Sequence, residues 1–426
     1  GARGSYASFL LHGVTGSGKT EVYLRAIEAV VERGEQALVL VPEIALTPQT
    51  VGRFASRFPD VAVLHSGLTD AERGRQWQRL LQGKAKVAVG ARSALFAPVQ
   101  NLGLIVLDEE HETSFKQDST PRYHAREMAI ARGEIEGAAV VLGSATPTLE
   151  SIGKARRGVY ELLTLPRRAG QGRLPKIIVQ DLRGEPKSAQ RQGVVLSRTL
   201  QVMIEERLRA CDQVLLFLNR RGYAPVTVCR ACGTKLNCPN CSTWLVEHRL
   251  AGRLQCHHCG YGAPLPKSCA SCGAEGTLVG CGPGVERLAE EAALLFPDAR
   301  LAIMASDTVH GPEAAQEFVR RMKAREIDLV IGTQIVAKGH DFPLLTLVGV
   351  VDADLSLGGG DLRAAERTFQ QITQVAGRAG RAERPGRVLL QTHAPEQPVM
   401  QALIAADSER FRAAELAARA RHQMPP

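Results

Sequence analysis

The feature that most limits the fold of this chain is a set of short, unbroken runs of apolar residues that alternate with helical patterns. Strands buried on both faces of a parallel sheet have such continuous runs, whereas half-exposed strands alternate polar and apolar residues. The runs fall into two series, so the sequence predicts two α/β domains, each built on a parallel sheet. The first series is Phe9–Leu11, Leu38–Val41, Val87–Val89, Leu104–Leu107 and Val140–Leu142, and the second is Val214–Leu218, Leu329–Ile331, Leu347–Val351 and Val388–Leu390.

The length, composition and charge of the chain agree with this organisation. At about 150 residues per domain, its 426 residues provide for two or three domains. No apolar stretch approaches the ~20 residues of a membrane-spanning helix and no secretory leader opens the chain, so we expect a cytoplasmic protein without a membrane partner. The 53 Lys and Arg residues exceed the 44 Asp and Glu residues, and the net charge of +9 favours a polyanionic partner.

Polar and cysteine-rich stretches that interrupt the two series predict the domain boundaries. We expect a first α/β domain over 1–166, a linker with the start of the second over 167–225, a cysteine-rich insertion over 226–284, the remainder of the second domain over 285–396, and a helical segment over 397–426 that leads to a domain absent from this chain.

The segment Gly13-Val14-Thr15-Gly16-Ser17-Gly18-Lys19-Thr20 matches the phosphate-binding pattern G-x-x-x-x-G-K-T. An apolar run precedes it, and a helical pattern that ends near Gly34 follows. Backbone N–H groups of such a loop, at the N-terminus of a helix, attract phosphates. We therefore expect ATP here, with Lys19 at the β- and γ-phosphates and the Thr20 hydroxyl as a Mg²⁺ ligand.

Two carboxylates, Asp108 and Glu109, directly follow the apolar run Leu104–Leu107. In folds of this type, a carboxylate at the end of a central strand lies beside the phosphate loop. Asp108 is then expected to hold Mg²⁺ through water, and Glu109 to polarise the attacking water. The loop and the acidic turn together predict an ATP-hydrolysing enzyme.

Eight of the ten cysteines form four C-x-x-C pairs, a spacing typical of zinc sites in a reducing compartment. We expect two Zn²⁺ in closed four-cysteine sites, which have no open position for catalysis. The short separation of the two middle pairs favours one site from these and one from the outer pairs, while a crossed pairing stays open. Cys211 and Cys281 are expected to be small buried residues. The pairs are Cys229/Cys232, Cys238/Cys241, Cys256/Cys259 and Cys269/Cys272.

The phosphate loop combined with the acidic turn Asp108–His111 resembles the superfamily 2 helicases. The resemblance implies two RecA-like motor domains with parallel sheets, the zinc-binding insertion lying in the second, and it places Gly339 and Asp341 at the nucleotide. Other segments resemble, in order, the first strand-contacting motif, the S-A-T motif, two parts of motif V and the Q-x-x-G-R-x-G-R motif: Val41–Gln49, Gly143–Pro147, Gly332–Gln334, Lys338–Phe342 and Gln374–Arg381.

In such helicases Gln374, Arg378 and Arg381 would complete the ATP site from the second domain. Hydrolysis spreads negative charge over the γ-phosphoryl oxygens, and an arginine supplied there is worth on the order of 10³–10⁵ in rate. Because Arg378 and Arg381 are three residues apart, we expect one helix to present both on one face.

Finer details are similar to one family, the bacterial replication-restart helicases known as primosomal protein N′, over essentially the whole chain. The residues are Gly13–Tyr23, Asp108–His111, Leu218–Tyr223 and the eight-cysteine insertion. This resemblance implies an ATP-dependent DNA helicase that moves 3′ to 5′ and unwinds stalled forks for primosome assembly. It also agrees with the nested zinc pairing. Single-stranded and forked DNA, primosome proteins and single-stranded-DNA-binding proteins are the expected partners of a monomer.

Other functions are compatible with parts of the pattern: a zinc-dependent scaffold for DNA and partners with a regulatory ATPase, an RNA helicase, or a small-molecule kinase with a P-loop. For a helicase we expect backbone contacts to DNA, and we hypothesise that Arg122, Tyr123 and His124 sense the strand and relay its presence to Asp108–His111. The expected DNA contacts are Thr47, Gln49, Arg92, Ser93, Arg220, Arg221, Thr333, Gln334 and Lys338.

Overall fold

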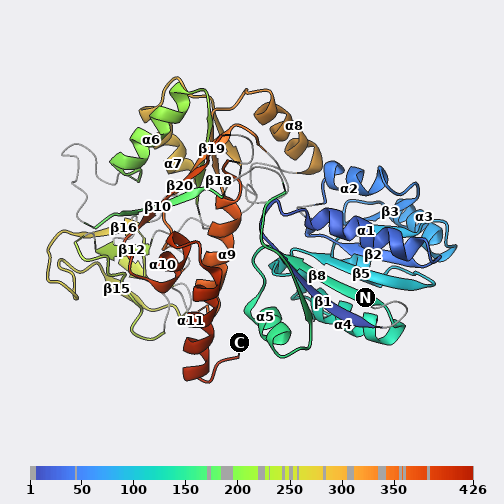
Figure 1. The fold of residues 1–426 in the computed structure, drawn as a ribbon. Helices are drawn as coiled ribbons and strands as arrows, with labels where there is room; N and C mark the ends of the chain where they lie inside the picture. Colours follow the sequence, from blue (N-terminus) through green and yellow to red (C-terminus); the bar gives the residue numbers. More distant parts are fainter. Residues whose placement is uncertain are drawn as a thin grey trace. The chain divides into compact units, whose positions relative to one another are not determined.

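The computed structural model divides the chain into two compact units, one up to residue 171 and one over 172–425 (Figure 1). Among the residues it describes, no helix is both long and apolar enough to cross a bilayer. The described residues are 6–43, 46–169, 174–183, 195–218, 226–229, 231–241, 245–248, 253–256, 259–281, 285–304, 311–333, 342–354, 357, 361–380 and 384–425.

The first unit is built on a seven-stranded parallel sheet with the order β3-β4-β2-β5-β8-β1-β9. The central strands β2 and β4 are buried along their whole length, as continuous apolar runs require. The strands are β1 (Ala7–Gly13), β2 (Gln36–Leu40), β3 (Val61–Leu64), β4 (Val87–Gly90), β5 (Leu102–Asp108), β8 (Ala139–Ser144) and β9 (Glu161–Leu165).

Helices cover the two faces of this sheet with separate apolar cores. One core includes Ile27 of α1 and Phe54 of α2, and the other includes Ala129 of α4 and Ile152 of α5. A short antiparallel hairpin of β6 (Lys116–Gln117) and β7 (Tyr123–His124) precedes α4. The helices are α1 (Lys19–Val31), α2 (Pro48–Ala55), α3 (Asp70–Leu81), α4 (Ala125–Glu136) and α5 (Leu149–Arg156), with 3-10 turns η2 (Arg92–Phe96) and η3 (Thr113–Phe115).

The second unit contains a six-stranded parallel sheet with the order β10-β20-β19-β11-β18-β17. Its central strands β11, β18 and β19 are buried throughout. The strands are β10 (Lys176–Asp181), β11 (Gln213–Phe217), β17 (Leu301–Met304), β18 (Leu329–Gly332), β19 (Leu345–Val350) and β20 (Arg387–Thr392).

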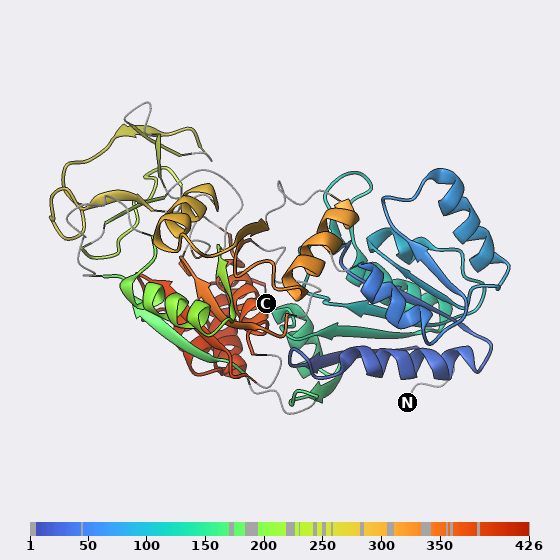
Figure 2. The same cartoon turned by 90° about the horizontal axis from the view of Figure 1, so that it is seen from above.

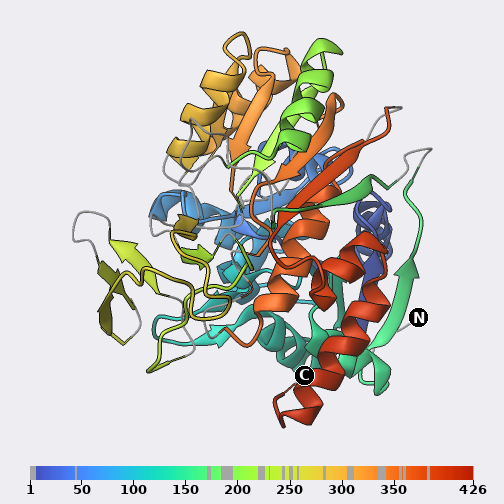
Figure 3. The same cartoon turned by 90° about the vertical axis from the view of Figure 1, so that its left-hand side faces the viewer.

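Helices α6 and α7 pack on one face of the second sheet, and α8 to α11 contribute to the core on the other. Figure 3 shows α10 and α11, in red, beside α9. Phe411 of α11 stacks on Phe369 of α9 with ring centroids 4.4 Å apart. The helices are α6 (Arg198–Arg209), α7 (Val285–Leu295), α8 (Gly311–Lys323), α9 (Ala364–Ala376), α10 (Pro398–Ile404) and α11 (Ser408–Arg421).

A five-stranded antiparallel sheet interrupts the second unit between β11 and β17, with the order β15-β14-β13-β12-β16. Figure 2 shows it, mostly in yellow, at one end of this unit. The strands are β12 (Val226–Cys229), β13 (Val246–His248), β14 (Arg253–Gln255), β15 (Gly262–Pro264) and β16 (Leu278–Cys281).

The predicted architecture of two parallel α/β sheets with a cysteine-rich insertion in the second is confirmed. The strands that the apolar runs did not predict are β3, β9, β10 and β17, which are the four edge strands of the two sheets. Two of them, β3 and β17, are themselves short apolar runs, but they are only partly buried, because an edge strand has a neighbour on one side only. The expectation for Cys211 is wrong: this residue is exposed, in the turn after α6, with a φ of 54°.

Candidate nucleotide site and cysteine clusters

The phosphate loop connects β1 to α1, and Gly18 caps the helix with a φ of 88° that favours glycine. Lys19 is the first helical residue, and its Nζ donates to the Gly13 carbonyl over 3.0 Å. The loop therefore turns back on itself around the lysine, at the positive end of a 13-residue helix.

The interior of this loop suits an anion. A β-carbon on Gly13 would lie 2.4 Å from Ser17 Oγ, so the loop closes tightly around that hydroxyl. Ser17 Oγ is buried, and no described residue forms a hydrogen bond with it. A buried hydroxyl without a partner, next to helix N-terminal N–H groups and a lysine, is chemically matched to a phosphate oxygen.

The acidic turn lies at the same edge of the sheet as the loop. Asp108, the last residue of β5, is in register with Gly143 of β8, which is in register with Leu11 of β1. Glu109 has a φ of 53°, an uncommon conformation for a residue with a side chain and one that recurs at functional sites. The order of the strands in the sheet therefore places the phosphate loop and the two carboxylates at the same edge.

Asp108 has a partner that the sequence analysis missed. The hydroxyl of Tyr23, on α1, donates to Asp108 Oδ1 over 2.9 Å. Burial and the neighbouring Glu109 raise the pKa of Asp108 to about 6, while Lys19 and this hydrogen bond oppose the rise. The pKa of Tyr23 is raised well above its ordinary value by burial and by Asp108, so the phenol stays protonated as a donor.

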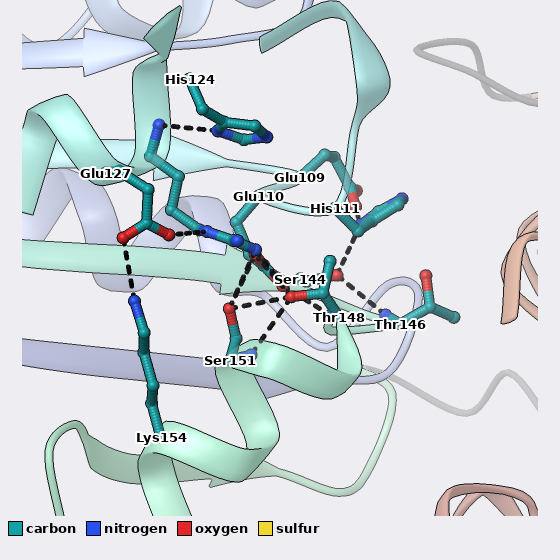
Figure 4. A network of polar contacts seen from close by, with 11 residues as sticks. Glu109, Glu110, His111, His124, Glu127, Ser144, Thr146, Thr148, Ser151 and Lys154 are labelled. Atoms are coloured by element: carbon teal, nitrogen blue, oxygen red, sulfur yellow. Dashed lines mark hydrogen bonds and ion pairs between the residues drawn. The ribbon is translucent and has the colours of Figure 1, made fainter. Parts of the chain in front are cut away.

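A buried polar network joins the acidic turn to two helix N-termini (Figure 4). Arg126 Nη1 of α4 contacts Glu110 Oε2 at 2.9 Å, and both side chains are buried. Glu110 also accepts from the Thr148 backbone N–H at 2.7 Å and from Ser151 Oγ at 2.9 Å. Burial alone would raise the pKa of Glu110, but Arg126 and the Thr148 N–H outweigh it and hold this pKa below its ordinary value.

The turn also contacts the segment predicted to be the S-A-T motif. His111 Nδ1 forms a 2.7 Å hydrogen bond with Ser144 Oγ, which accepts from the Thr146 N–H over 2.9 Å. His111 Nδ1 also lies 3.6 Å from Glu109 Oε2. One histidine therefore links a carboxylate of the site to the end of β8.

The hairpin β6–β7 lines a hollow of about 600 Å³ with residues 116–118 and 122–124, and residues of η2 pack on its Tyr123 ring. Arg92 lies over the Tyr123 ring, 5.8 Å from its centroid, and the exposed Phe96 meets the same ring edge-on. His124 Nδ1 accepts from the backbone N–H of Arg126, the residue that pairs with Glu110. Two contacts, His124 with Arg126 and Arg126 with Glu110, therefore connect the hairpin to the acidic turn.

In the second unit, the expectation that one helix presents both Arg378 and Arg381 is wrong. Helix α9 contains Gln374 but ends at Ala376, so Arg378 lies in the following turn. Gly377 is the C-cap of this helix, and Gly380, three residues further on, has a φ of 67° that favours glycine in the turn. Several expected site residues lie outside the described part of the chain: Arg220, Arg221, Gln334, Lys338, Gly339, Asp341 and Arg381.

The eight paired cysteines gather into two clusters with the nested pairing. Cys229 and Cys232 face Cys272 and Cys269 across 3.6 and 3.7 Å between sulfurs, and the corresponding distances in the other cluster are 3.5 Å. Four thiolates about 2.3 Å from one tetrahedral Zn²⁺ would be separated by about 3.8 Å, so both clusters suit this ion. The second cluster comprises Cys238, Cys241, Cys256 and Cys259.

The two clusters have different surroundings. Lys235, just beyond the outer cluster, donates its Nζ to the Asp354 carbonyl over 2.8 Å, and a β-carbon on Gly233 would lie 2.8 Å from the His393 carbonyl. The inner cluster instead packs with Leu245 and Leu254 of the insertion. The outer cluster therefore anchors the insertion to the second sheet, while the inner one organises the insertion itself.

Comparison with known proteins finds matches for the first unit and for the cysteine-rich insertion. Residues 4–155 match the family described as DEAD/DEAH box helicase, and residues 238–264 match the PriA DNA helicase Cys-rich region domain. The chain is 46% identical over 419 residues to the replication restart protein PriA of Bacillus subtilis, and 46% identical over 418 residues to that of Rickettsia conorii. Each alignment covers 98% of this chain, but the chain spans only 52% and 64% of these two relatives.

Solved helicase structures share the fold. RecG bound to a three-way DNA junction aligns with 96% of this chain and 43% of its own, with a TM-score of 0.55 and 17% identity. The DUF1998 helicase MrfA bound to DNA aligns with 95% of this chain and 46% of its own, with a TM-score of 0.54 and 14% identity. The predicted resemblance to bacterial replication-restart helicases is confirmed by the PriA relatives and the PriA Cys-rich region.

Proposed function

We propose that this chain, which is similar to PriA replication restart proteins and matches the DEAD/DEAH box helicase and PriA Cys-rich region models, is the motor segment of an ATP-dependent DNA helicase. In this proposal the motor moves 3′ to 5′ on single-stranded DNA as a monomer and unwinds duplex at stalled forks, so that a primosome can assemble. Primosome and single-stranded-DNA-binding proteins would be its partners. The observation that carries the proposal is the meeting of Lys19 and Asp108 at one sheet edge, in a chain 46% identical to a replication restart protein.

The first unit would bind and hydrolyse ATP. The residues Gly13–Thr20 would surround the phosphates, and the Lys19 ammonium would exchange the Gly13 carbonyl for β- and γ-phosphate oxygens. Thr20 and Asp108 would hold Mg²⁺, which neutralises charge on those oxygens. Glu109, the next residue, would accept a proton from the attacking water.

The second unit would supply positive charge to the reacting phosphate. Gln374 and Arg378 lie at and just beyond the end of α9, and Arg381, Gly339 and Asp341 would complete the same site. An arginine at the γ-phosphoryl group stabilises charge that develops only during hydrolysis. ATP would then hold the two units together, and hydrolysis would release them, which gives stepping along a strand.

The hairpin Lys116–His124 would report the presence of DNA. A base stacked on an aromatic side chain contributes ~1–3 kcal/mol of binding, and Tyr123 with Arg92 offers such a platform. Movement of His124 would act on Arg126 and hence on Glu110, next to the proposed base Glu109. Replacing Tyr123 by alanine should keep basal ATPase activity and lower its stimulation by single-stranded DNA, and unchanged stimulation would exclude this route.

The insertion would contain two structural Zn²⁺, one in each cysteine cluster. Both clusters are closed four-sulfur sets, so zinc would fold the insertion and perform no catalysis. Elemental analysis should find two zinc atoms per chain. One or none would reject the assignment.

The deciding experiment measures ATP hydrolysis with and without single-stranded DNA, and separation of a forked duplex, for the wild-type chain and three variants. Lys19→Ala should abolish both activities, and Arg378→Ala should lower the hydrolysis rate by about 10³-fold or more. Arg25→Ala is the matched surface control, since the Arg25 side chain is 74% exposed, and it should behave as wild type. An ATP hydrolysis rate that single-stranded DNA does not change would overturn the proposed function, and so would strand separation by the Lys19→Ala variant.

A further inference from the structure

We propose that Tyr23 is a positioning residue for the metal-binding carboxylate: its hydroxyl fixes the orientation of Asp108, and Gly143 is glycine so that this hydroxyl can reach across β8. The inference rests on the proposed function, because it assigns a role at the ATP and Mg²⁺ site. It concerns a residue of α1 that faces the sheet rather than the phosphates.

The contact between the two side chains is direct and enclosed. Tyr23 is 1% exposed and belongs to the apolar core of the α1 face, with Leu24 and Ile27. Its hydroxyl lies 2.9 Å from Asp108 Oδ1. A protonated phenol donates one hydrogen and an ionised carboxylate only accepts, so the direction of this hydrogen bond is fixed.

The residue at position 143 supports the same conclusion independently. In the sheet register Gly143 lies between Leu11 and Asp108, on the strand that separates the phosphate loop from the acidic turn. A β-carbon there would lie 1.6 Å from the Tyr23 hydroxyl oxygen and 2.7 Å from the ring carbon that carries it. The tyrosine therefore passes directly over β8, and a side chain at position 143 would displace its hydroxyl.

The hydroxyl itself needs an explanation that packing does not give. A phenylalanine would fill the same apolar space without burying a polar atom, which costs free energy when it has no partner. The partner here is Asp108, and with Oδ1 occupied, Oδ2 would be the oxygen that accepts from a metal-bound water. Loss of an outer partner of a metal-binding group typically costs about 10–100-fold in metal affinity or activity.

The test compares Tyr23→Phe with wild type in two assays on the whole chain. Binding of a fluorescent ADP analogue is titrated in EDTA and again at increasing Mg²⁺. In EDTA, Tyr23→Phe should bind the ADP analogue with the same affinity as wild type. To reach the tighter affinity that depends on the metal, the variant should need a Mg²⁺ concentration about 10-fold or more higher than wild type. The Mg²⁺ concentration for half-maximal ATP hydrolysis should rise in parallel. Tyr160→Phe, at a second buried tyrosine of this unit, is the control and should change neither value.

A mutant cycle separates positioning from general damage. If Tyr23 acts through Asp108, Tyr23→Phe should have no further effect on metal-dependent ADP binding in an Asp108→Asn background. A wild-type Mg²⁺ requirement for Tyr23→Phe, in a chain whose wild type hydrolyses ATP, overturns the inference and leaves the proposed function intact. A wild type that neither binds nor hydrolyses ATP overturns the proposed function instead.

Discussion

The buried ion pair between Arg126 and Glu110 allows a quantitative prediction. Their side chains are 8% and 0% exposed, and the charged atoms lie 2.9 Å apart. Arg126→Met keeps a long apolar stem but removes the charge. Glu110 would retain its hydrogen bonds from Thr148 and Ser151 and lose its only ion-pair partner among the described residues.

The expected loss of stability is large. Removing one partner of a buried pair typically costs ~3–5 kcal/mol, because the other charge stays buried without compensation. A unit of this size loses about 2–4 °C of Tm for each kcal/mol of unfolding free energy that is lost. The Tm of the first unit should therefore be about 6–20 °C lower in the variant than in wild type. Replacing both partners should cost less than replacing one, since no uncompensated charge then remains.

The pH dependence has a definite sign. The folded-state pKa of Glu110 lies below the ordinary value of 4.5, so the pair contributes fully above about pH 4.5. This contribution is lost as the pH falls through the depressed pKa of the folded state. The difference in stability between wild type and Arg126→Met should therefore be greatest near neutral pH and narrow in acid.

Calorimetric unfolding of the whole chain measures these effects. Arg25→Met is the control, because its ion pair with Glu21 lies at the surface, where water screens the charges and such pairs contribute little to stability. The double variant Arg126→Met with Glu110→Gln should recover part of the loss. A loss below about 1 kcal/mol for the single variant, or a double variant less stable than the single one, would refute the reasoning.

Three further predictions use other parts of the structure. Gly143→Ala should lower the free energy of unfolding by ~1–3 kcal/mol, because its β-carbon overlaps the Tyr23 hydroxyl, and denaturant titration measures this. Phe411→Ala should destabilise the second unit by ~3–5 kcal/mol, because the ring stacks on Phe369 in the core, and a calorimetric transition of unchanged Tm would contradict the packing. Cys238→Ser should remove one zinc atom and leave the other, as elemental analysis would detect, and loss of both would argue against independent clusters.

Much of the chemistry was predictable from local patterns. The phosphate loop, the acidic turn Asp108–His111 and the four cysteine pairs consist of residues close in sequence, and each motif carries its own geometry. The apolar runs likewise predicted the central strands, because a strand covered on both faces must be apolar along its length. The four edge strands were missed, although β3 and β17 are apolar along their whole length and only partly buried.

The sequence by itself determined which residues have the chemistry that the proposed function needs: a lysine and two carboxylates that suit a nucleotide, and eight thiols that suit zinc. The tertiary structure alone decided which partners these residues have. Tyr23 reaches Asp108, Arg126 reaches Glu110, and His111 reaches Ser144 across separations of 85, 16 and 33 residues. Such contacts depend on the order of the strands and the placement of the helices, and both follow from hydrophobic burial of the whole sheet. A pattern of residues close in sequence therefore cannot predict them.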